Sequence, residues 1–75
     1  MHELVVAADR VQGAPPIMPR HVEVWLEGEE GQAVRRAAAA GELFVRLDAA
    51  GGERLRVTGV WQDPHTAERL TLFLA

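Results

Sequence analysis

Hydrophobic and polar residues alternate with a period of two over residues 42–61, ELFVRLDAAGGERLRVTGVW, and this is the clearest pattern in the chain. Leu43, Val45 and Leu47 fall on one side of the first half, and Leu55 begins the same pattern in the second. Such alternation is typical of half-buried strands, and the two glycines between the halves favour a tight turn. We therefore predict a β-hairpin over this stretch.

The register of this hairpin follows from its aliphatic residues. A one-residue slip turns every side chain to the other face, so a common buried face requires a loop with an odd number of residues. Two loops meet this condition: a three-residue loop with Gly51 in the left-handed conformation, or a five-residue loop over residues 49–53. In both alternatives the polar face carries three arginines and one aromatic residue: Arg46, Arg54, Arg56 and Phe44.

The same reasoning predicts the other regular elements. Alternation indicates strands over residues 3–8, 21–27 and 68–75. Residues 29–40 are expected to form a helix, because two glutamates open the segment and Gly41 stands where a left-handed cap belongs.

Residues 9–20 contain three of the four prolines, which fix the backbone and remove hydrogen-bond donors. We expect a long loop or an extended, polyproline-like crossing here, with Ile17 and Met18 anchoring it to the core.

The predicted order is β-loop-β-α-β-β-β. It indicates the α+β class: a small, mainly antiparallel five-stranded sheet or partly open barrel with one short helix. The length of 75 residues predicts a single domain, residues 1–75. A chain of this size buries only about 60% of its unfolded surface, so without disulfides its stability must come from packing or from association with itself or a partner.

Composition excludes several chemistries. The chain has no cysteine, serine, tyrosine or lysine, which excludes disulfides, thiolate metal sites and Ser- or Lys-based covalent catalysis. The three histidines show no metal-binding spacing. We therefore predict a non-enzymatic protein with no catalytic residue, cofactor or metal. No segment approaches the ~18 apolar residues of a membrane span, and a cytoplasmic location with no membrane partner is expected.

Four apolar residues fall opposite the aliphatic sides of their strands: Trp25, Phe44, Val60 and Phe73. Two interpretations are open. If exposed, these residues form an interaction surface for a partner or for a second copy. If the Ala-rich helix covers them, they form the main core instead. Trp61 falls with the aliphatic residues and is expected in the core.

The arginine face of the hairpin, Arg46, Arg54 and Arg56, also has two interpretations. Arginines beside an aromatic residue can hold single-stranded nucleic acid by phosphate contact and stacking. Alternatively, they form ion pairs with Glu23, Glu27 and Asp48. The formal net charge of −3 favours ion pairing.

Together these features predict a small protein–protein interaction module or complex subunit, regulatory in character and self-associating, with a homodimer or hetero-complex as its assembly. The alternative function is a nucleic-acid-binding small β-barrel that uses the arginine face.

Overall fold

The computed structural model describes residues 2–48 and 51–75. Its elements follow one another as β1 (His2–Ala7), the 3₁₀ turn η1 (Ala8–Arg10), β2 (Gln12–Ala14), β3 (Met18–Trp25), α1 (Gly28–Ala39), β4 (Leu43–Asp48), β5 (Arg54–Gln62) and β6 (Arg69–Leu74). The predicted α+β class, with one helix and a mainly antiparallel sheet, is confirmed. The sheet has six strands in the described residues rather than the five expected, because β2 was not foreseen.

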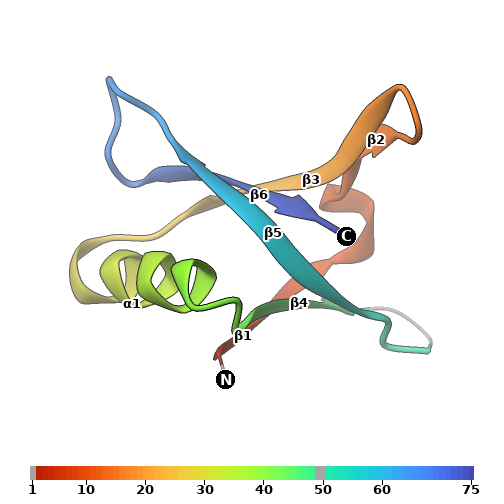
Figure 1. Ribbon diagram of the computed structural model, residues 1–75, viewed down its shortest axis with the longest axis horizontal. Coiled ribbons are helices and arrows are strands. Elements are labelled where there is room, and N and C mark those ends of the chain that lie inside the picture. Colours follow the sequence, from red (N-terminus) through yellow and green to blue (C-terminus); the bar gives the residue numbers. More distant parts are fainter. Residues whose placement is uncertain (1, 49–50) are drawn as a thin grey trace.

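The strands are ordered β1-β4-β5-β6-β3-β2. β1 runs parallel to β4, and every other neighbouring pair is antiparallel. Figure 1 shows the sheet curling into a half-barrel, with the long strand β5 crossing its middle and α1 beside one end. One parallel and three antiparallel pairings separate β1 from β3, so these two strands run in opposite directions. Residues of both strands line one groove.

The core lies on the inner face of this half-barrel. Because side chains alternate along a strand, one apolar set from each strand points inward. The helix contributes Val34, which is completely buried, and packs against β5 and β4. Nine residues make up the buried core: Val22, Val34, Leu43, Val45, Leu55, Val57, Leu70, Leu72 and Leu74. The hairpin pattern therefore predicted the buried face correctly.

The β4–β5 register selects one of the two predicted loops. Arg46 pairs with Arg54, and the Leu47 N–H donates to the Glu53 carbonyl at 2.8 Å. This is the register of the three-residue loop. Gly51 has φ 95°, the left-handed conformation that this loop demands. The other two loop residues, Ala49 and Ala50, lie outside the described residues.

A bulge in β5 overturns two predicted placements. The register with β6 shifts between Val57 and Gly59, so the residues after the shift change faces. Val60 consequently packs against the core, whereas it was expected on the opposite face. Trp61, expected in the core, points outward and is 49% exposed. Unbroken alternation was the wrong assumption here, because a bulge adds a residue without a partner.

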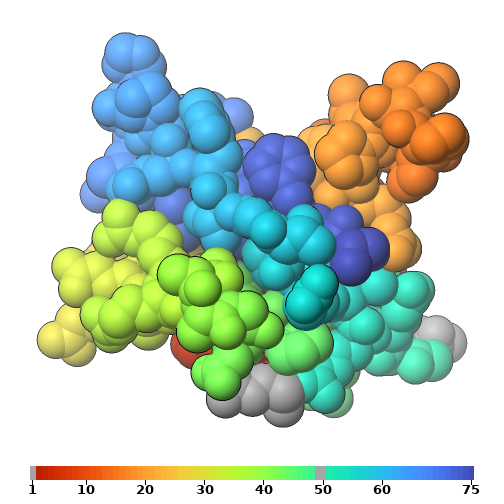
Figure 2. All heavy atoms as spheres, viewed as in Figure 1, coloured from red at the N-terminus to blue at the C-terminus, as the bar shows by residue number. Residues whose placement is uncertain are grey.

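The proline-rich stretch also differs from expectation. Residues 12–14 form β2 and pair with β3, so the predicted loop is a short hairpin. Ile17 and Met18 do not anchor it to the core; Ile17 at the tip is 92% exposed. Figure 2 shows this tip, in orange, projecting from the body of the molecule. The hairpin is fixed by backbone pairing, so its apolar tip is not needed for packing.

Candidate interaction surfaces

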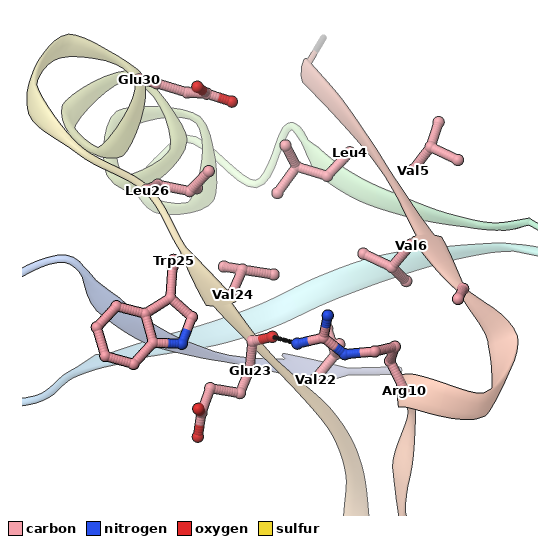
Figure 3. A pocket seen from close by; sticks show the side chains of 11 residues that line it. Leu4, Val5, Val6, Arg10, Val22, Glu23, Val24, Trp25, Leu26 and Glu30 are labelled. Atoms are coloured by element: carbon pink, nitrogen blue, oxygen red, sulfur yellow. Dashed lines mark hydrogen bonds between the residues drawn. The ribbon is translucent and has the colours of Figure 1, made fainter.

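A groove of about 440 Å³ lies between β1 and β3, where the half-barrel remains open. Its walls come from residues 4–7 and 22–26, with Arg10 and Glu30 at its ends. Figure 3 shows that Leu4 and Val6 project from one wall toward Val24 on the other, whereas Trp25 and Val5 point away from them. The floor of the groove is therefore aliphatic, and its ends carry charged side chains.

The wall formed by β1 is a strand edge without a neighbouring strand in the described chain. The His2 N–H donates to the Glu42 carbonyl at 2.9 Å, which directs the backbone groups of His2 toward β4. Because the direction of these groups alternates along a strand, the backbone groups of Leu4 and Val6 also face β4, whereas those of Val5 and Ala7 face the groove. This edge offers donors and acceptors at strand spacing.

The wall formed by β3 has the same character. The Leu26 N–H donates to the Glu68 carbonyl at 2.9 Å. The backbone groups of Val24 therefore also face β6, and the backbone groups of its neighbours Glu23 and Trp25 face the groove. β2 covers a different part of β3, with its register at His21 and Met18. The Glu23 carbonyl accepts a hydrogen bond of 3.1 Å from Arg10 Nη2, drawn in Figure 3. A side chain thus occupies one position that a strand would otherwise fill.

The predicted apolar surface is not one patch. Trp25 is 60% exposed on the outer side of β3, and Phe73 is half-buried on β6 with its ring centroid 6.1 Å from that of His21. Phe44 lies on β4, separated from β6 by β5. Val60 belongs to the core face. The helix packs on the inner face of the sheet and not over these aromatic residues, so of the two interpretations the one with helical cover does not hold.

Two of the three arginines of the arginine face pair with one acid, Glu3, which was not among the expected partners. Glu3 lies 3.2 Å from Arg46 Nε and 3.4 Å from Arg54 Nε. The guanidinium of Arg54 also lies over the Phe44 ring, 4.2 Å from its centroid. Arg56 is exposed and has no ion pair within residues 2–48 and 51–75. Ion pairing was expected with Glu23, Glu27 and Asp48; the parallel β1–β4 pairing supplies Glu3 instead.

Glu23 has another partner, Arg69 on β6. Arg69 Nη2 lies 2.8 Å from Glu23 Oε2, and Nη1 lies 3.2 Å from Asp63 Oδ2. The hydrogen bond to Glu23, followed by the charge of that carboxylate, raises the pKa of Arg69 above its ordinary value. Asp63 also accepts a 2.8 Å bond from the His65 N–H, which closes the turn before β6. This network links β3, β6 and the turn on the outer face of the sheet, the side opposite the core.

Nothing in the sequence pattern pointed to the groove residues Arg10 and Glu30. No local pattern distinguishes them, because the groove depends on which strands become edges of the sheet. The free edge of β1 could have been suspected from its place at the start of the chain, but the approach of β3 depends on the curl of the sheet.

No group of three or more His, Asp or Glu side chains in the described ranges could hold a metal ion. The α-helix there, twelve residues long, falls short of the length and apolarity of a membrane-spanning helix. The sequence matches no family model, no curated protein and no solved structure. The groove and the outer face are therefore the features from which a function is inferred.

Proposed function

We propose that this chain is a small binding domain for a polypeptide partner and that the partner occupies the groove between β1 and β3. The observation that carries the proposal is that the free edge of β1 and the stretch of β3 not covered by β2 face one aliphatic groove. Exposed edges are ready-made binding templates, and natural proteins usually cover or blunt them. A volume of about 440 Å³ also falls in the range of specific ligand pockets.

The proposed function is binding and not catalysis. The groove is lined by aliphatic residues, one tryptophan, one arginine and two glutamates, and these lining residues bring no nucleophile beside a base. Buried aliphatic surface with a few polar groups at the ends is the usual composition of a protein-binding site.

Selection from a random peptide library tests this proposal. Displayed peptides of about ten residues, the upper length of a typical strand, would be enriched on the immobilised protein. The chain has no cysteine, so a single thiol can be placed at will. We expect a bulky maleimide attached to Ala7→Cys in the groove wall to weaken binding of the enriched peptides by about tenfold or more, ~1.4 kcal/mol.

Ala39→Cys provides the matched control, since Ala39 is an exposed alanine at the end of α1 and outside the groove. The same label there should leave binding unchanged. Equal loss from both labels, or none from either, would place the peptide site elsewhere. Failure to enrich any peptide would end the proposal.

A second candidate function is single-stranded nucleic-acid binding by the outer face. The exposed cation Arg56 favours this function. It lies opposite Phe44 on the neighbouring strand, and the guanidinium of Arg54 is stacked over the Phe44 ring. The two ion pairs of Glu3 oppose it. Fluorescence anisotropy with a labelled oligonucleotide at low salt provides the test.

If the outer face binds the oligonucleotide, Arg56→Glu should abolish binding. Arg36→Glu, the same charge reversal on an exposed position of α1, should reduce it little. Equal effects would indicate non-specific attraction, and no binding by the unmodified protein would exclude this function.

A further inference from the structure

We propose that the occupant of the groove is an extended segment of a different protein, which adds as a strand between β1 and β3 with aliphatic inward positions and a basic side chain near α1. This inference rests on the proposed function and specifies the partner that it requires. It follows from the backbone edges, from the pairing state of this chain's own strands and from the charges at the groove ends.

The two backbone edges require an occupant with its own backbone available. The backbones of Val5 and Ala7 on β1, and of Trp25 on β3, direct main-chain N–H and C=O groups into the groove from opposite sides. An extended peptide presents such groups alternately to its two sides at the same spacing, which is the basis of recognition by strand addition. A helix satisfies its backbone groups internally and would leave both edges unpaired.

The strand directions define what insertion would produce. Because β1 and β3 run in opposite directions, the inserted strand is parallel to one of them and antiparallel to the other. Its inward side chains would rest on Leu4, Val6 and Val24 and continue the core layer of the half-barrel. The insertion would join the free edge of β1 to the part of β3 that β2 leaves uncovered.

A folded second copy does not fit this role. Every strand in the described chain is already hydrogen-bonded to at least one neighbour, so none has both edges free. A groove with an edge on each side accepts a segment that can pair on both sides. The occupant is therefore a segment that is unpaired before binding, such as a tail or an extended loop of another protein.

The charges at the groove ends indicate which charged side chain the occupant should carry. Glu30 lines the groove at its α1 end and has no ion pair within the described ranges, and the chain carries a formal net charge of −3. Glu23, on the β3 wall, is already bonded to Arg69. A lysine or arginine of the occupant near Glu30 is thus complementary, and an acidic residue there is disfavoured.

Arg10 competes with the occupant for one wall. Its guanidinium donates to the Glu23 carbonyl and takes the place that an incoming N–H would use. We expect Arg10→Ala to strengthen peptide binding by about threefold, the order of one modest hydrogen bond. A weakening would instead make Arg10 part of the binding surface and contradict its role as a competitor.

An N-methyl scan of the most enriched library peptide tests strand addition. Methylating one backbone nitrogen at a time removes single donors without changing side chains. A strand paired on both sides should lose about tenfold in affinity at consecutive central positions, measured by calorimetry. Loss at alternate positions only would show pairing with one wall, and insensitivity throughout would show recognition by side chains; either result overturns the inference while the proposed function stands.

Charge reversal tests the basic side chain. Glu30→Lys should weaken the same peptide by about fivefold or more, whereas Glu29→Lys, outside the groove on the same helical turn, should not. Equal effects would contradict the assigned position of the basic residue. Light scattering over a concentration series should show a monomer; a dimer that the enriched peptide dissociates would make the occupant a second copy.

Discussion

At the scale of single residues, Gly13 matters for its backbone conformation and for the space that its missing side chain leaves. Gly13 in β2 has φ 122°, and a Cβ there would lie 2.4 Å from the Pro19 carbonyl oxygen. Glycine allows β2 to approach β3 closely, and this converts the proline-rich stretch into a hairpin. The exposed tip at Ile17 is a consequence of that pairing.

Gly13→Ala should therefore lower the free energy of unfolding by about 2 kcal/mol, from backbone strain and the clash with Pro19. Gly28→Ala is the matched comparison, since Gly28 also has positive φ, 56°, but its Cβ would meet no atom within 4 Å. That variant should lose about 1 kcal/mol from strain alone. Denaturant titration of both proteins measures the difference, and equal losses would show that the close approach is not maintained in solution.

At the scale of elements, the direction of each backbone group in β1 is decisive. The assigned register directs the Val6 N–H toward β4 and the Val5 N–H into the groove. Proline is tolerated where a strand's N–H faces away from the sheet and harmful where that N–H is bonded. Two neighbouring valines therefore offer a direct test of the free edge.

Val5→Pro should change the free energy of unfolding by less than about 1 kcal/mol, because no ladder bond is lost. Val6→Pro should cost about 2 kcal/mol more than Val6→Ala, a control for the lost side chain, because the bond to β4 is removed. Thermal unfolding followed by circular dichroism provides the measurement. A larger loss at Val5 than at Val6 would mean that the opposite set of β1 residues faces the groove.

At the scale of the whole molecule, helix and half-barrel share one core. α1 is rich in alanine. Among the described residues of the buried core, Val34 is the one that the helix contributes. A helix with so small an apolar face is held by what the sheet provides, including Leu43 and Leu70. The open edge between β1 and β3 leaves this small core without a closed wall on one side.

Val34→Ala should accordingly destabilise the entire fold by about 2 kcal/mol and lower the midpoint of thermal unfolding by roughly 10 °C, as expected for a domain of this size. Gln32→Ala, at an exposed position of the same helix, should stay within about 0.5 kcal/mol. If helix and sheet probes unfolded separately in Val34→Ala, the single shared core would be refuted.

Most of the local elements and most of the buried face follow from the sequence alone, because both depend on the period of apolar residues along the chain; β2 and the faces of Val60 and Trp61 are the exceptions. The β4–β5 hairpin, the helix ending before Gly41 and the strands around Val22 and Leu72 follow from that period. The odd loop followed as well, since Leu47 and Leu55 had to share a face. The class of the fold required no further information.

Which elements meet is a property of the tertiary structure. The bulge that exchanged Val60 and Trp61 depends on the fit of β5 to β6, and the pairing of Glu3 with two arginines depends on a parallel contact between segments far apart in the chain. The groove arises because β1 is an edge of the sheet and the curl brings β3 opposite it. Local pattern carries no information about such neighbours, because strand order and curvature are set by packing among all the elements at once.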